Sequence, residues 1–197
     1  MKWRECFDRK PRRYRTGSGC SFGVQHADLI FRTLSLGAGD CFLDAGCGPG
    51  EYSILAAELV GPKGSVIALD CDPYMIRQLQ QAVKDRHTAN ILSLVATLGV
   101  PLPLKAQLAD VCLISSVLHM PGLDNHWEVL FKELHRVLRN GARLGIIESH
   151  KSDAAPELPL HLRLTPETVV AEIRTYGFEQ RGLIDLSSSY LVWFERS

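Results

Sequence analysis

Short apolar runs alternate with amphipathic segments along most of this chain. The runs CFLDA (41–45), SVIALD (65–70), ILSLV (91–95), ADVCLIS (109–115) and RLGIIES (143–149) have the length and composition of buried strands, and segments with helical spacing separate most of them. Strands that alternate with helices pair in parallel through right-handed crossovers. The pattern therefore predicts an α/β fold with a doubly wound, mostly parallel sheet and helices on both faces.

The C-terminal part of the chain has a different pattern. A helix is predicted from Thr165-Pro166 to Gly177, and two strand-like runs follow, FEQRGLIDL and SYLVWFER. Only a short connection separates these runs, which is typical of two antiparallel strands joined by a hairpin. We expect this hairpin to form one end of the sheet.

Length and charge limit the domain organisation and the class of partner. The 197 residues, 46% of them hydrophobic, fit one domain, which we assign to residues 24–197. The 22 basic and 22 acidic residues balance, so nucleic acid is not an expected partner. Residues 1–16 hold seven basic and two acidic residues, a charge of +5. Residues 1–23 are therefore predicted to be a basic N-terminal arm, either a solvated segment or a lid.

The sequence also bears on location and metals. Charged residues interrupt the first ten positions, where a secretory signal would be apolar, and Gly99, Pro101 and Pro103 break the longest uncharged stretch, so a cytoplasmic protein without a membrane span is expected. The six cysteines include no C-x-x-C pair. Free thiols and no metal are predicted, with a site built from Cys6 and Cys20 as the alternative.

A glycine-rich loop follows the first predicted strand. It reads D-A-G-C-G-P-G from Asp44 to Gly50, and in doubly wound folds ligands bind beyond the carboxyl ends of the strands. A dinucleotide fingerprint starting at Gly46 would require a small residue at position 51, where this chain has Glu51. Asp70 ends the second strand, 20 residues after Gly50, where a carboxylate can accept hydrogen bonds from both ribose hydroxyls. The loop and Asp70 together predict a nucleoside without a pyrophosphate.

Four segments, FLDAGCGPG, VIALDCDP, DVCLISSVLHM and ELHRVLRNGARLGIIE, resemble the class I S-adenosylmethionine-dependent methyltransferases, and most closely the small-molecule (type 11) group related to quinone-biosynthesis enzymes. The resemblance implies a Rossmann-like seven-stranded sheet, S-adenosylmethionine as cofactor, the glycine loop at its methionine end and Asp70 at its ribose. The family often has an acid after the third strand, but Thr97 and Leu98 stand there, so adenine would be held by backbone or apolar contacts. The candidate cofactor-binding residues are Asp44, Gly46, Cys47, Gly48, Gly50, Asp70, Cys71, Thr97, Leu98 and Ser115.

Two residues are candidates for catalysis. His119 follows the fourth strand and Glu148 ends the fifth; the family order makes these strands neighbours, so both side chains would lie at one mouth. His119 is the candidate base for a small-molecule acceptor that loses a proton, or a residue that positions this acceptor; capping a helix or contacting solvent is its alternative role. The sequence Ser-Ser-Val-Leu at 115–118 lacks the motif of methyltransferases that act on nucleobases or glutamine. A non-catalytic methyltransferase-like subunit stays open, whereas Glu51 and the chain length disfavour a nicotinamide-dependent oxidoreductase.

Overall fold

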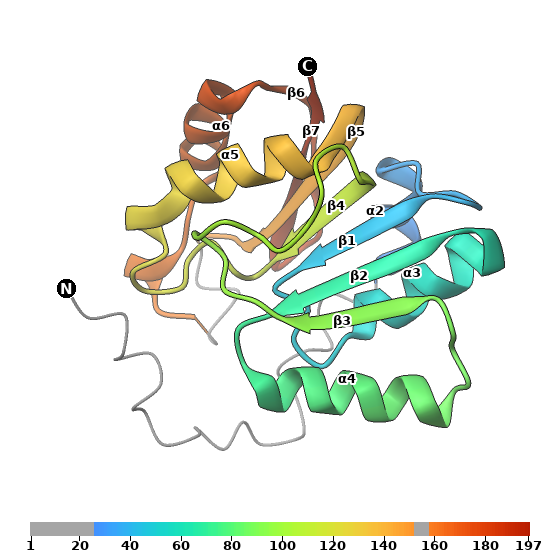
Figure 1. Cartoon of the computed structure of the whole chain (residues 1–197). Coiled ribbons are helices and arrows are strands. Elements are labelled where there is room, and N and C mark those ends of the chain that lie inside the picture. The colour runs from blue at the N-terminus through green and yellow to red at the C-terminus, as the bar shows by residue number, and fades with distance from the viewer. Residues whose placement is uncertain (1–25, 152–157) are drawn as a thin grey trace.

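The computed structural model describes residues 26–151 and 158–197, and in this part of the chain seven strands form one sheet (Figure 1). The strand order is β3-β2-β1-β4-β5-β7-β6. Strands β1 to β5 pair in parallel, and β7 is antiparallel to both of its neighbours, β5 and β6. The predicted doubly wound sheet with an antiparallel C-terminal hairpin is confirmed. The strands are β1 Cys41–Ala45, β2 Ser65–Asp70, β3 Ile91–Val95, β4 Ala109–Ser115, β5 Leu138–Ser149, β6 Phe178–Asp185 and β7 Ser189–Arg196.

Helices cover both faces of the sheet. On one face, α2 (Ala27–Thr33) and α3 (Glu51–Val60) pack on the central strands, and α4 (Pro73–Asp85) packs beside α3. On the other face, α5 (Trp127–Val137) and α6 (Pro166–Ile173) cover a second apolar core. Residues in a strand alternate between these cores: Leu113 belongs to the α2/α3 side, and its neighbour Ile114 belongs to the α5/α6 side. Short 3₁₀ helices span Gly61–Lys63, Asp124–His126, Leu160–Leu162 and Arg174–Tyr176.

Strand β5 starts earlier than the sequence pattern indicates. It begins at Leu138, directly after α5, rather than at the predicted run of 143–149. Ala109 of β4 pairs with Leu138 and Val111 pairs with Arg143, so β5 bulges between these two points. Gly141 has a φ of 75° there, a conformation that costs glycine little. Asn140 and Gly141 therefore lie in a bulge inside a longer strand.

The connection from β3 to β4, residues 96–108, contains no helix and is held against α5 by two charged side chains. The Leu102 N–H donates to Glu133 Oε2 at 2.7 Å. Arg136 donates to the Leu104 carbonyl at 2.8 Å and pairs with Glu133. Leu98 and Leu102 are buried and complete the core on the α5/α6 side. The side chains of α5 thus order a loop that leads away from the carboxyl end of β3.

Several sequence predictions fall on residues outside the described ranges: the basic arm of residues 1–23, and the alternative metal site at Cys6 and Cys20. Within the described residues, Cys41, Cys47 and Cys112 are free thiols, and His, Cys, Asp and Glu side chains form no group of three that could hold a metal ion. None of the helices described is both long enough and apolar enough to cross a membrane.

Candidate functional site

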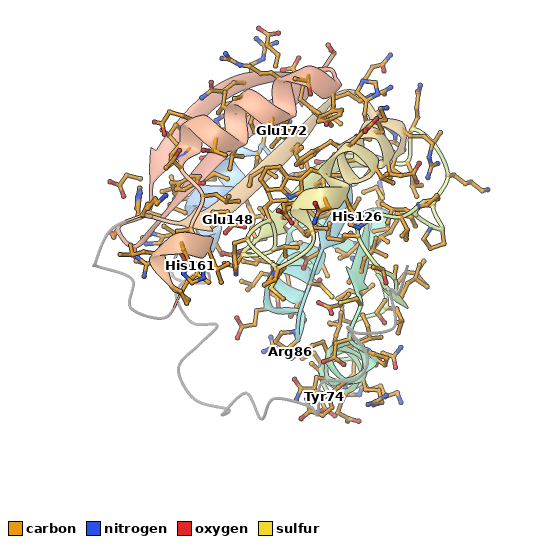
Figure 2. The ribbon with its side chains drawn as sticks, turned by 90° about the vertical axis from the view of Figure 1, so that its left-hand side faces the viewer. Tyr74, Arg86, His126, Glu148, His161 and Glu172 are labelled. Carbon is orange, nitrogen blue, oxygen red and sulfur yellow. The ribbon has the colours of Figure 1, made fainter. Side chains whose placement is uncertain are left out.

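The strand order reverses between β1 and β4, and this switch point marks the candidate site. From β1 the chain proceeds outward through β2 and β3, and then returns to the other side of β1 with β4 and β5. Loops that diverge at such a point leave a crevice at the carboxyl ends of the strands, where doubly wound folds bind ligands. Figure 2 faces this edge of the sheet, with Glu148 near the middle of the view.

The glycine loop after β1 is shaped by packing at two glycines and is open at the third. Gly46 and Gly50 have φ values of 86° and 89°, and a Cβ atom there would overlap the side chains of Val117 and Leu79, respectively. Gly48 also has a positive φ, 54°, but a Cβ atom at this position would meet no heavy atom within 4 Å. Gly46 and Gly50 therefore bring the loop close to its neighbours. Gly48 presents bare backbone to open space.

Asp70, at the carboxyl end of β2, is fixed by two backbone amides. Its Oδ2 accepts from the Gly48 N–H and its Oδ1 accepts from the Asp72 N–H, both at 2.8 Å. Partial burial raises the pKa of Asp70, and the two amides oppose that rise. The carboxylate thus lies directly beside Gly48, as the spacing of the two motifs predicts. Each oxygen retains a lone pair with which to accept a ligand hydroxyl.

Asp44 is more deeply buried than its place at the end of β1 indicates. It is 2% exposed, and the Ser53 hydroxyl of α3 donates to its Oδ2 at 2.5 Å. Burial raises the pKa of Asp44 to about 7, with Asp70 adding to the rise and Ser53 opposing it. Sequence reasoning missed Ser53. The signal for it was a serine in the stripe of α3 that faces the sheet, where the other residues are apolar.

The other predicted cofactor-binding residues lie along the same edge with different exposures. Cys47 is buried, and its burial together with Asp44 and Asp70 raises the pKa of its thiol, which therefore stays protonated and unreactive. Cys71, the residue that follows Asp70 in the chain, is exposed. Thr97 is half-buried, whereas the Leu98 side chain lies in the α5/α6 core. The structure therefore leaves the Leu98 backbone, rather than its side chain, for contact with a ligand.

His119 and Glu148 form a hydrogen-bonded pair. His119 Nδ1 lies 2.7 Å from Glu148 Oε2, and Glu148 Oε1 accepts from the N–H groups of Val117 and Leu118 at 3.0 and 2.8 Å. Glu148 is fully buried, and the His119 side chain is 12% exposed. The two side chains are predicted to lie at one mouth, and the direct contact between them is an additional finding. When Glu148 is a carboxylate it can only accept, so Nδ1 is the donor in this contact, and in the neutral imidazole Nε2 then keeps a lone pair.

The turn that carries His119 begins with a residue in the left-handed region. Ser115 ends β4, half-buried, and Ser116 follows with a φ of 57°. The Ser116 N–H donates to the Ile147 carbonyl of β5 at 2.8 Å. A non-glycine residue in this conformation is sparsely populated unless its surroundings fix it. The bonds to Ile147 and Glu148 supply that constraint and hold the turn over the end of β5.

Comparison with known proteins places this arrangement in a family. Residues 42–141 match the model of a methyltransferase domain. The demethylmenaquinone methyltransferase of Lactobacillus johnsonii is 32% identical over 132 residues, which is 66% of this chain and 52% of that protein. The arsenite methyltransferase of Halobacterium salinarum is 29% identical over 123 residues, 62% of this chain and 30% of that protein.

A solved structure shares the fold. The S-adenosylmethionine-dependent methyltransferase from Aquifex aeolicus superposes with a TM-score of 0.80 at 22% identity, covering 87% of this chain and 89% of that one. This chain spans about half the length of the demethylmenaquinone methyltransferase that it matches. The matched region contains the glycine loop, Asp70 and His119, the features described above. The chain belongs to the methyltransferase-domain family and has the class I, S-adenosylmethionine-dependent methyltransferase fold.

Proposed function

We propose that this protein transfers the methyl group of S-adenosylmethionine to a small-molecule acceptor that loses a proton in the reaction, with His119 as the base and Glu148 as the residue that positions it. The observation that carries the proposal is the placement of the His119–Glu148 pair at the same edge of the sheet as the glycine loop and Asp70. The relatives support a small-molecule acceptor, because their names specify a demethylmenaquinone and arsenite.

The residues at this edge fit the cofactor that the family implies. The open space at Gly48 admits a bulky group close to the backbone, and the adjacent Asp70 carboxylate matches a ribose diol. Asp44, Glu51 and Asp70 favour a ligand with positive charge rather than a pyrophosphate. S-adenosylmethionine carries an adenosine, a sulfonium and an amino-acid group, and its sulfonium supplies an activated methyl group. Asp70 would hold the ribose, and Gly46 to Gly50 would line the remainder.

The protein then has little covalent chemistry to perform. An activated donor requires mainly that the acceptor atom be held in line with the methyl carbon, and proximity of this kind contributes roughly 7 to 11 kcal/mol. His119 Nε2 would take the proton of an acceptor hydroxyl as the new bond forms, or the proton of an acceptor ammonium beforehand, which frees the nitrogen lone pair for the attack. Glu148 would stabilise the resulting imidazolium through Nδ1, because the carboxylate is buried and already oriented by two amides.

Replacing Asp70 with alanine is expected to weaken S-adenosylmethionine binding by about 1.5 to 3 kcal/mol, the scale of hydrogen bonds to a charged group. Titration calorimetry on the folded variant measures this change. Asp72→Ala is the matched control, since Asp72 accepts from the Tyr74 N–H at 2.8 Å and caps α4. That variant should lose about 1 kcal/mol of stability with unchanged affinity. Equal affinity of Asp70→Ala and wild type would remove Asp70 from the ribose site.

Native mass spectrometry of the purified protein tests the proposal as a whole. Co-purified S-adenosylhomocysteine, the product left after methyl transfer, is the expected result. A chain that binds neither S-adenosylmethionine nor this product would be a methyltransferase-like subunit without catalysis. Retention of a nicotinamide dinucleotide would favour an oxidoreductase instead, against the charge of Glu51 at the first position of α3.

A further inference from the structure

Tyr52, the second residue of α3, carries a hydroxyl group that the mechanism above does not use. The side chain is 9% exposed, and among the described residues its buried hydroxyl oxygen makes no hydrogen bond of acceptable length and angle. The Phe31 ring meets the Tyr52 ring edge-on, with centroids 6.0 Å apart, and holds it in place. A buried polar group without a well-formed hydrogen bond costs free energy, and a hydrogen-bond partner on a bound ligand would offset that cost.

The surroundings of Tyr52 lie on the opposite face of the sheet from the His119–Glu148 pair. Tyr52 packs in the α2/α3 core with Phe42 and Leu113, whereas Glu148 pairs in register with Tyr190 of the α5/α6 core. Burial raises the pKa of Tyr52, and the Ser115 side chain opposes that rise as a weak partner whose contact falls outside hydrogen-bond length and angle. The Tyr52 hydroxyl therefore lies by the carboxyl end of β4, at the switch point.

The start of α3 adds an electrostatic argument. Tyr52 is in the first turn of this ten-residue helix, whose N-cap, Gly50, has no side chain to cap the free amides. The partial positive charge of a helix N-terminus favours a carboxylate. The acids nearby, Asp44, Glu51 and Asp70, favour a ligand that is cationic overall. An amino-acid group with an ammonium, a carboxylate and an adjacent sulfonium satisfies both conditions.

We propose that the Tyr52 hydroxyl is a specificity-determining donor to an oxygen of the bound ligand, and we assign that oxygen to the carboxylate of the amino-acid end of the cofactor. This inference rests on the proposed function, because it presupposes that S-adenosylmethionine is bound. An oxygen of the methyl acceptor is the other possible source of the same chemistry. Two ligands that differ only at the amino-acid end separate the sources.

The experiment measures binding of S-adenosylhomocysteine and of 5′-methylthioadenosine, which lacks the amino-acid group, to wild type and Tyr52→Phe. We expect the variant to bind S-adenosylhomocysteine about ten-fold or more weakly and 5′-methylthioadenosine within about two-fold of wild type. Its thermal midpoint should equal or exceed that of wild type, since no internal hydrogen bond is lost. Tyr176→Phe is the control; its hydroxyl donates to Glu172, away from Glu148 in Figure 2, and both affinities should be unchanged.

Each other outcome overturns a different statement. If wild type binds neither ligand, the proposed function fails and this inference fails with it. If wild type binds both ligands and Tyr52→Phe binds both equally tightly, the assignment of Tyr52 to the cofactor carboxylate is wrong. If that variant then changes only the KM for the compound that is methylated, the oxygen that Tyr52 contacts belongs to the methyl acceptor. An equal loss of affinity for both ligands would place Tyr52 at the nucleoside part of the site, without a contact to the carboxylate. A clearly lowered thermal midpoint would show that the hydroxyl has a structural partner.

Discussion

Replacing His119 with alanine is expected to lower the rate of methyl transfer by about 10²- to 10⁴-fold while leaving S-adenosylmethionine affinity unchanged. The reason is position: His119 follows β4 and is held by Glu148 of β5, whereas the glycine loop and Asp70 follow β1 and β2. The loss should shrink as the pH rises, because a more ionised acceptor needs less help from a base. The measurement is a pH profile of single turnovers, with an acceptor found by screening for S-adenosylhomocysteine formation.

Glu148→Gln distinguishes a positioning role from a merely structural one. The amide oxygen of glutamine can still accept from the Val117 and Leu118 N–H groups, so the turn should stay ordered. Its NH₂ group would then face Nδ1 of His119, which moves the proton to Nε2 and removes the lone pair that takes the acceptor proton. We expect a rate loss in the same range as for His119→Ala, with little change in stability.

His135→Ala, at the far end of α5, is the control and should retain full activity. A small, pH-independent loss in His119→Ala would mean that the acceptor is already deprotonated in solution, as a thiolate or carbanion is. A large loss of cofactor affinity without a separate rate defect would move His119 into the cofactor site. Either result would contradict the role of His119 as a base.

Replacing Asp44 with asparagine is expected to stabilise the ligand-free protein by as much as about 4 kcal/mol above pH 7. Burial raises the pKa of Asp44 from 3.8 to about 7, and each pKa unit corresponds to about 1.36 kcal/mol. Between these pH values the folded chain keeps a proton that the unfolded chain has lost, so wild-type stability falls as the pH rises. Asparagine does not ionise, so the variant does not lose this stability as the pH rises, and the asparagine carbonyl can still accept a hydrogen bond from Ser53.

Urea unfolding of wild type and Asp44→Asn across pH 4 to 8 tests this prediction. The stability difference should be near zero at about pH 4, grow through pH 5 and 6, and level off above pH 7. Asp124→Asn, at an exposed position, is the control and should show no such growth. We also expect Asp44→Asn to bind S-adenosylmethionine more weakly, because the sulfonium loses a nearby negative charge. A difference that is constant with pH would contradict the buried ionisation.

The parts of the site that the sequence predicts depend on backbone position. Asp70 and the glycine loop meet because parallel neighbours β1 and β2 end at the same edge, and His119 meets Glu148 because β4 and β5 do. Such pairs follow from the strand order, which the resemblance to the methyltransferase family implies and the structure confirms. Even the missing acid at Thr97 and Leu98 is visible in the sequence.

What the sequence does not show depends on the direction of single side chains. Ser53 and Tyr52 stand in a helical stripe that faces the sheet, and periodicity does not distinguish a serine that bonds Asp44 from one that only fills space. Likewise, Glu133 and Arg136 have the spacing of an ordinary surface ion pair on α5. The hydrogen bonds by which they fix the loop after β3 are tertiary contacts between residues more than thirty positions apart in the chain.

That loop also has a practical value for protein engineering. Arg136 anchors it at the Leu104 carbonyl through its side chain and at the Gln107 N–H through its own carbonyl, and the exposed Lys105 and Ala106 lie between these anchors. The span precedes β4 and so lies at the opposite edge of the sheet from the glycine loop, Asp70 and His119. Exposed backbone between two fixed points is the kind of position that accepts inserted sequence. A reporter or affinity tag inserted between Lys105 and Ala106 would therefore leave the edge of the sheet that carries the candidate site accessible to ligands.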